Sequence, residues 1–234
     1  MLHYNIIMQK IANFMRDTQN SLAARVKITG LKRPVRLVAG ADASCYGNNI
    51  IGSACLFTYP SPDKLDKIDE SIVIQETDFP YIPGFLSFRE APALIGAIKG
   101  LRHMPDAIIV DGQGIAHPRR IGLASHIGVL LDTVTVGAAK SRLIGTYEEP
   151  GMEKGSRSSL FDSAECIGVV LRSRTGVRPL FVSPGHLIDI DGAVDMVLSC
   201  LSRYRLPEPV RCAHNAAAVA RQQCEAILLG PPSE

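Results

Sequence analysis

Three acidic residues lie at positions where a folded protein tolerates a carboxylate poorly. Asp42 lies inside one short apolar run, Asp111 directly follows another, and Glu90 lies near the start of a helical pattern between them. If these carboxylates cluster, their repulsion raises the pKa of at least one of them unless a cation neutralises the group. Oxygen ligands without a nearby Cys or His pattern suit Mg²⁺ or Mn²⁺, which serve phosphodiester chemistry at such sites. The three acids therefore predict a divalent-metal site.

Two basic residues could assist this chemistry. Lys140 lies just past the apolar run Val134–Gly137, where its ammonium group could stabilise charge on a phosphate or orient an attacking water. His214 lies near the start of a predicted helix and could bind a metal, move a proton or bind phosphate. Spacing alone leaves a second interpretation open, in which the acids only cap helices or face solvent.

The residues after Asp111 extend the candidate site. The sequence from 111 to 120 reads DGQGIAHPRR, and its two glycines let the backbone approach a ligand closely. The basic residues that follow suit an anionic substrate such as phosphate. The alternative is an ordinary strand that ends in a tight turn, because Asp-Gly is a common turn signal.

A stiff loop precedes Glu90. Pro80 and Pro83 bracket Tyr81 and Ile82, so the segment has few conformations and lacks two backbone donors. An aromatic ring held on such a loop could act as a wedge. The alternative is a rigid connection with a buried tyrosine.

Composition limits the class of protein. The chain has 234 residues, of which 46% are hydrophobic and 21% are charged, and its net charge is +2. These values are typical of a globular domain, and a nucleic-acid site must then be a local patch. No segment resembles a signal peptide or a membrane span, so we expect a cytoplasmic protein. None of the six cysteines forms a C-x-x-C pair, which favours free core thiols in a reducing compartment over zinc or disulfides.

The apolar pattern predicts strands first and alternating helices and strands later. Strands are expected over Arg36–Cys45, Ile50–Tyr59, Glu70–Phe79, Ala107–Val110, Val134–Gly137, Ala164–Arg172 and Leu180–Ser183. Helices are expected over Leu2–Val26, from Gly84 to about Leu101, from Arg120 or Ile121 to Leu131, over Ala193–Arg203 and over Ala213–Leu229. The segment Tyr147–Ser159 is expected to be a surface loop.

This order predicts one α/β domain over residues 1–234, with a frayed tail from about 230. Its mixed sheet would have three antiparallel strands followed by parallel strands, and helices would flank it. If the first strand and the strand ending at Val110 are neighbours, Asp42 and Asp111 meet at one edge of the sheet.

Five segments, in order, closely resemble the endonuclease V family, the repair nucleases for deaminated purines. They are VAGADAS, PYIPGFLSFRE, VDGQGIAHPRRIGLASHIGVLLDTVTVGAAKSRLIG, PLFVSPGH and YRLPEPVRCAH, and the resemblance spans roughly residues 5 to 225. It implies a ribonuclease H-like fold. It also implies that Asp42, Glu90 and Asp111 bind Mg²⁺, with Mn²⁺ able to substitute, and that Lys140 and His214 assist catalysis.

The same resemblance assigns the nucleic-acid contacts. Tyr81 matches the residue inserted where the lesion base is displaced, and Gly84, Leu86, Gly112 and Gly114 would line the pocket for that base. Gln113 departs from the His or Asn that family members often carry. The lesion-binding residues implied in this way are Pro80, Tyr81, Ile82, Pro83, Gly84, Leu86, Gly112, Gly114, His117, Arg119 and Arg120.

The implied reaction is hydrolysis of a phosphodiester one nucleotide past the lesion on its 3' side, leaving 3'-hydroxyl and 5'-phosphate ends. The partner would be DNA with deaminated bases, or RNA that contains inosine, and the protein would act as a monomer. Three other functions remain open. They are a different ribonuclease H-like nuclease such as a junction resolvase, a catalytically silent inosine-binding module, and a small-molecule metallohydrolase.

Overall fold

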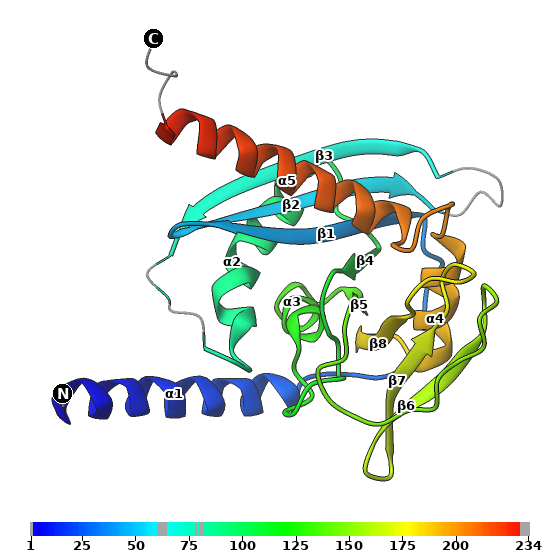
Figure 1. The fold of residues 1–234 in the computed structure, drawn as a ribbon, viewed down its shortest axis with the longest axis horizontal. Helices are drawn as coiled ribbons and strands as arrows, with labels where there is room; N and C mark the ends of the chain where they lie inside the picture. Colours follow the sequence, from blue (N-terminus) through cyan, green and yellow to red (C-terminus); the bar gives the residue numbers. More distant parts are fainter. Residues whose placement is uncertain (1, 60–64, 78, 80–81, 230–234) are drawn as a thin grey trace.

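The computed structural model describes residues 2–59, 65–77, 79 and 82–229, with side chains described from residue 9 to residue 226 within that range. These residues form an eight-stranded mixed sheet with helices on both faces (Figure 1). The strand order is β3-β2-β1-β4-β5-β8-β7-β6. The strands are β1 (Leu37–Tyr46), β2 (Asn49–Thr58), β3 (Lys67–Glu76), β4 (Ala107–Val110), β5 (Val134–Ala139), β6 (Arg157–Asp162), β7 (Glu165–Leu171) and β8 (Leu180–His186).

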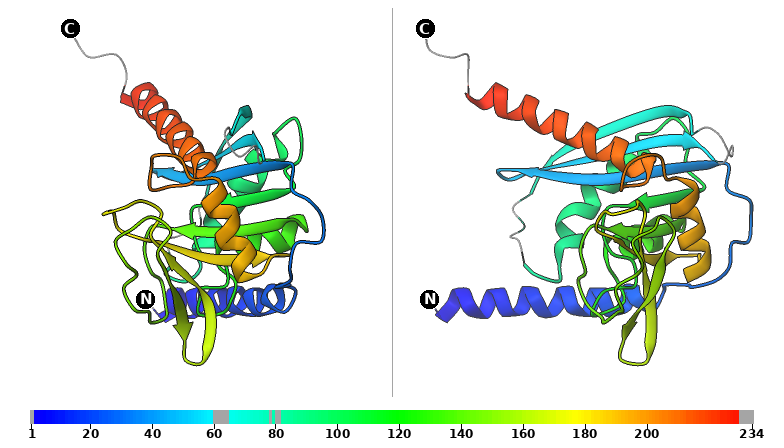
Figure 2. Two further views of the ribbon diagram at one scale, coloured as in Figure 1. Left: turned by 90° about the vertical axis from the view of Figure 1, so that its right-hand side faces the viewer. Right: turned by 45° about the vertical axis from the view of Figure 1, so that its right-hand side comes forward.

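Helices cover the two faces in pairs that are not consecutive in the chain. In Figures 1 and 2, α2 (Leu86–Lys99) and α3 (Leu123–Leu131) lie on one face, and α4 (Ile190–Ser199) and α5 (Glu208–Leu229) lie on the other. The N-terminal helix α1 (Leu2–Ala23) packs beside α3. No helix among the described residues is long and apolar enough to cross a membrane.

The sequence of the short strand β4 is apolar without alternation because both faces of the strand are packed. Ile108 and Val110 pack in the core cluster under α2 and α3, whereas Ala107 and Ile109 pack in the cluster under α4 and α5. All four residues are fully buried. A strand covered on both faces needs a continuous apolar run, so β4 is the central strand that the sequence predicted.

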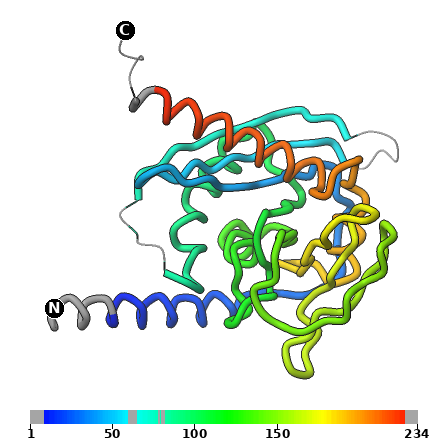
Figure 3. The backbone as a smooth tube through the Cα atoms, viewed as in Figure 1, coloured from blue at the N-terminus to red at the C-terminus, as the bar shows by residue number. Residues whose placement is uncertain are grey.

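The predicted mixed sheet is confirmed. β1, β2 and β3 form an antiparallel meander, and β1, β4 and β5 run parallel to one another. Beyond β5, however, β8 pairs antiparallel, and β7 and β6 continue antiparallel to the far edge. Figure 3 shows the β6–β7 hairpin at the side of the molecule away from β1, β2 and β3.

Several expected element bounds need correction, among them the start of α5, which is Glu208 and not Ala213, and the bounds of β3, which are Lys67–Glu76 and not Glu70–Phe79. Residues 157–159 lie in β6 and not in a surface loop. They are polar and are exposed or half-buried because β6 is an edge strand, so this part of the sequence carries a weak apolar signal. Helix α4 begins at Ile190, three residues before the expected start. Its N-cap is Asp189, whose side chain accepts a hydrogen bond from the Gly192 amide. The predicted fraying from about residue 230 lies outside the described residues.

Candidate active site

Parallel pairing of β1 with β4 places two of the predicted acids side by side. Ala41 is in register with Val110, and the Asp111 amide donates to the Ala41 carbonyl at 3.0 Å. Asp42 and Asp111 each come directly after one residue of this pair, so they lie side by side on neighbouring strands of the sheet. A carboxylate oxygen from each of them and a ring nitrogen of His214 all lie within 4.8 Å of one another.

Glu90, from the next layer, lines the same pocket as Asp42 and Asp111. It lies in the second turn of α2, and the helix packs on β1 and β2 through buried residues such as Ala91 and Leu94. Burial, then the charges of Asp42 and Asp111, raise the pKa of Glu90 to about 7. Burial and the neighbouring Asp111 also raise the pKa of Asp42. Neighbouring carboxylates that raise the pKa of Asp42 and of Glu90 form a set of oxygen donors with too little positive charge around it, and a divalent cation would supply that charge.

Lys140 and His214 reach the acids from two further elements. Lys140 follows β5, and its Nζ lies 2.5 Å from Oδ2 of Asp111. His214 lies on α5, and its Nδ1 lies 2.6 Å from Oδ2 of Asp42 and 3.5 Å from Nζ of Lys140. All five predicted residues therefore meet at one place, although they come from five different elements.

A pocket of about 480 Å³ opens beside these residues. Its volume is within the range of small-molecule sites. Three acids and Lys140 line it together with five other polar residues, and glycines and apolar side chains form the rest of the wall. That wall includes Gly84, Leu86, Gly112, Ile121, Gly122, Leu123, Ala139 and Leu143.

Most of the predicted pocket glycines line this cavity, but Gly114 does not. A Cβ on Gly114 would lie 2.0 Å from the Pro184 carbonyl oxygen, so this glycine lets the loop after β4 pack against β8. At Gly112, a Cβ would meet the Leu123 side chain at 3.3 Å beside the cavity. The two glycines therefore have different reasons for lacking a side chain.

Gln113 links the loop after β4 to the loop that carries Lys140. Its Nε2 donates to the Ser141 carbonyl at 2.8 Å, and the residue is 9% exposed where it borders the pocket. Its Oε1 is buried and has no hydrogen-bond partner among the described residues. Because the Ser141 carbonyl can only accept, the amide orientation is determined, and Oε1 is an acceptor without a donor.

Arg119 has internal partners. Its guanidinium donates to the Gly84 carbonyl at 2.7 Å and to Oε1 of Gln19, and it stacks over the Phe85 ring. Gln19 is fully buried and also donates to the Gly84 carbonyl at 3.0 Å. Gly84 has φ +81°, a conformation that favours glycine. This network links Gly84, which lines the pocket, to Gln19 of α1.

The neighbouring basic residues are similarly occupied. Arg120 forms ion pairs with Asp162 at 2.8 Å and Glu165 at 2.7 Å. Burial and the nearby Arg119 charge lower the pKa of His117 to about 4, so this buried histidine is neutral. The sequence suggested these residues for anion binding, and the structure gives both arginines partners within the protein.

The predicted wedge falls partly outside the described residues. Pro80 and Tyr81 are not described, while Ile82 is half-buried and Pro83 is exposed. Two positioning residues were not identified from the sequence. They are Gln19, a polar residue within an ordinary amphipathic helix, and Arg205, which donates to the Lys140 carbonyl at 2.6 Å. Neither lies in a motif that could have indicated its role.

The comparisons with known proteins agree on one family. The family model described as Endonuclease V matches residues 20–215. An endonuclease V of Geotalea uraniireducens is 49% identical over 209 residues, which are 89% of this chain and 88% of that protein. The crystal structure of endonuclease V from Streptomyces avermitilis has a TM-score of 0.85 at 36% identity, and the match covers 92% of this chain and 94% of that one.

A more distant structure carries a nucleic acid. It is endonuclease V from Ciona intestinalis in complex with DNA that contains an inosine followed by a ribo-adenosine. Its TM-score is 0.76 at 25% identity, and the match covers 92% of this chain and 98% of that one.

Proposed function

The chain belongs to the endonuclease V family and is a nuclease, and we propose that it cuts DNA strands that contain deaminated purines, above all inosine. The proposed cut lies one nucleotide past the lesion on its 3' side and leaves 3'-hydroxyl and 5'-phosphate ends. The inosine-containing DNA bound by the Ciona intestinalis relative supports this substrate. The observation that carries the proposal is the group of three acids and Lys140 lining one pocket, with His214 bonded to Asp42 beside it.

Asp42, Glu90 and Asp111 are proposed to hold a divalent cation, Mg²⁺ with Mn²⁺ able to substitute. The raised pKa values of Asp42 and Glu90, together with the oxygen donors of all three side chains, support this assignment. When bound, the ion would act as a Lewis acid toward a phosphoryl oxygen of the substrate. The three side chains would thereby orient the scissile phosphate at the edge of the sheet.

Lys140 and His214 are proposed to act on charge and protons. An ionised Asp42 can only accept the 2.6 Å hydrogen bond from His214, so in that state Nδ1 carries the proton and Nε2 of a neutral ring would keep a lone pair. That lone pair is available to accept a proton during hydrolysis. The ammonium group of Lys140, close to both Asp111 and His214, would stabilise negative charge that develops on the phosphate.

The pocket is proposed to hold the displaced base. Extruding a mismatched inosine costs less than extruding a paired base, which supplies part of the selectivity. Tyr81 is proposed to fill the gap in the strand by stacking, which contributes about 1–3 kcal/mol per base. Tyr81→Ala should then weaken binding to inosine-containing duplex by roughly ten- to a hundredfold. Binding to undamaged duplex should change little.

A strand-nicking assay tests the proposal. Matched strands with and without one inosine, as DNA and as RNA, are incubated with the protein and Mg²⁺ or with EDTA. We expect nicking only with inosine and only with the metal, and the RNA arm reports whether inosine in RNA is also a substrate. Asp42→Ala and Asp111→Ala should each abolish nicking while circular dichroism shows a retained fold.

The same assay distinguishes the other functions. Cleavage of branched, inosine-free DNA with no cleavage at inosine would indicate a junction resolvase. Near-normal Mg²⁺-dependent turnover by either aspartate variant would remove the metal assignment.

A further inference from the structure

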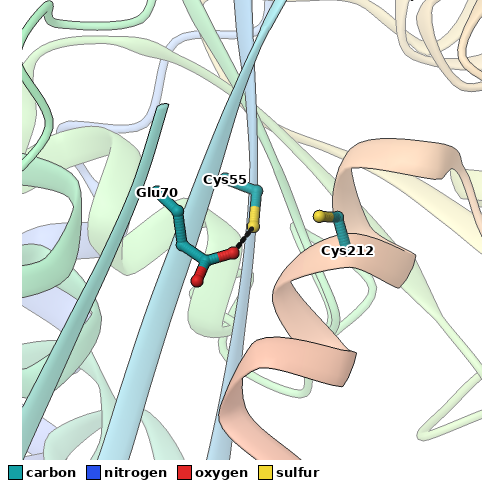
Figure 4. Close-up of side chains that lie close together, drawn as sticks. All are labelled: Cys55, Glu70 and Cys212. Atoms are coloured by element: carbon teal, nitrogen blue, oxygen red, sulfur yellow. Dashed lines mark hydrogen bonds between the residues drawn. The ribbon is translucent and has the colours of Figure 1, made fainter. Parts of the chain in front are cut away.

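A second group of ligand-type side chains lies away from the candidate active site. Cys55 is buried in the middle of β2, Glu70 lies opposite it in the β2–β3 register, and Cys212 lies in the first half of α5. Figure 4 shows the Cys212 side chain projecting from the helix toward Cys55, with Glu70 pointing at Cys55 from the other side. Three elements thus converge, and 157 positions in the chain separate the two cysteines.

The distances suit a metal ion. One donor atom from each residue lies within 4.8 Å of the other two. Zinc in a tetrahedral site binds sulfur at about 2.3 Å and carboxylate oxygen at about 2.0–2.2 Å, which requires a sulfur–oxygen edge of about 3.5 Å. Sγ of Cys55 already lies 3.4 Å from Oε2 of Glu70. Only a small movement of Cys212 is then needed to complete a three-ligand face.

The donor chemistry selects the ion. Two thiolates and a carboxylate favour Zn²⁺ over Mg²⁺ or Ca²⁺, which prefer oxygen alone. Glu70 is 34% exposed, so the group has an entry path and room for a water as the fourth ligand. Lys67 now lies 2.6 Å from Oε2 of Glu70, and its side chain is 40% exposed, so it can leave for solvent when a cation arrives.

We propose that Cys55, Glu70 and Cys212 form a zinc site that joins β2, β3 and α5. This site differs from the all-carboxylate group of the proposed nuclease centre in both ligands and position. Because Cys212 lies two residues before His214 on the same helix, a bound ion would anchor the part of α5 that carries His214. The proposal makes Zn²⁺ a structural ligand of this chain.

Cobalt titration of the reduced, metal-free protein tests the proposal. Co²⁺ is added with saturating Mg²⁺ present, so that the carboxylate group is occupied. We expect one equivalent to produce a thiolate-to-cobalt charge-transfer band together with the visible bands of tetrahedral cobalt, and one equivalent of Zn²⁺ should abolish them. Zn²⁺ should also raise the melting temperature of the reduced protein.

Variants make the test specific. Cys212→Ser, at a half-buried position, should lose the charge-transfer band, whereas Cys224→Ser on the same helix should keep it. Glu70→Gln should keep the band but weaken cobalt affinity at least tenfold. No charge-transfer band in the reduced wild-type protein, or a band that survives Cys212→Ser, would overturn the proposal. These readouts do not involve nuclease activity, so they stand apart from the proposed function.

Discussion

Nζ of Lys140 lies 2.5 Å from Oδ2 of Asp111, so a fixed cation already contacts one carboxylate of the acidic group. The ammonium offsets part of the repulsion between the acids in the metal-free protein. It also competes with a divalent ion for the same oxygen. Lys140 therefore bears on both the metal affinity and the chemical step.

Replacing Lys140 separates those two effects. In Lys140→Met, we expect the cleavage rate at saturating metal to fall about 100- to 1,000-fold, the usual effect of removing one group that stabilises transition-state charge. The Mg²⁺ concentration for half-maximal activity should fall, because the ammonium no longer competes for Asp111. Lys154→Met, at an exposed loop position, is the control. An unchanged rate in Lys140→Met would exclude a catalytic role for the lysine.

Glu90 should make the metal-free protein sensitive to pH. Its pKa is raised from its ordinary value of 4.5 to about 7 by burial and by Asp42 and Asp111, with Arg89 acting in the opposite direction. Between these values the folded state binds more protons than the unfolded state. The stabilising contribution is therefore fully present below about 4.5 and is lost as the pH rises through about 7.

Denaturant unfolding in EDTA, from about pH 5 to about pH 8, measures this effect. The stability advantage of Glu90→Gln over the wild type should grow as the pH rises, and Mg²⁺ should reduce it at the upper end. The buried histidines are common to both proteins and cancel in the difference. If the free energies of unfolding of the two proteins changed with pH in the same way, this result would contradict the raised pKa of Glu90.

Gln113 should matter through its bond to the Lys140 loop. Gln113→Ala removes the 2.8 Å hydrogen bond to the Ser141 carbonyl, worth about 0.5–1.5 kcal/mol. We expect the cleavage rate to fall roughly threefold to tenfold, since the neighbouring Lys140 is less well positioned. Ser141→Ala is the matched control, because it keeps the main-chain acceptor and should behave like the wild type. Equal losses in both variants would point to another cause.

Two arginines near the pocket should have different roles: Arg119 should stabilise the fold, and Arg142 should bind the nucleic acid. Arg119→Ala breaks the links to Gly84 and Gln19, so it should lower the free energy of unfolding by about 1–3 kcal/mol. Within the part of the chain that the structure describes, the Arg142 guanidinium donates a hydrogen bond to the Gly145 carbonyl and lies over the Tyr147 ring, and neither group neutralises it. Arg142→Ala should leave stability unchanged and reduce the salt slope of duplex binding by about 0.9. If Arg119→Ala changed the salt slope of duplex binding and Arg142→Ala did not, these assignments would be reversed.

The sequence by itself determined the central strand, most other elements and the types of the five candidate site residues. Ala107–Val110 was readable because burial on both faces demands an uninterrupted apolar run, and β4 has those bounds. Asp42 and Asp111 stood out because a carboxylate beside such a run needs a cation or donors. Their adjacency depended on whether the two strands are neighbours, which the sequence left as a condition and the β1–β4 pairing fulfils.

Only the tertiary structure decided which polar groups were free. Arg119 and Arg120 look alike in the sequence as anion-binding residues, but Gln19, Asp162 and Glu165, each at least 42 positions away, occupy them. Cys55 and Cys212 carry no local spacing signal, and they meet because α5 crosses β2. The local sequence pattern indicates which secondary structure a segment forms and which of its residues are buried. Contacts between distant segments depend on how the helices and the sheet pack together.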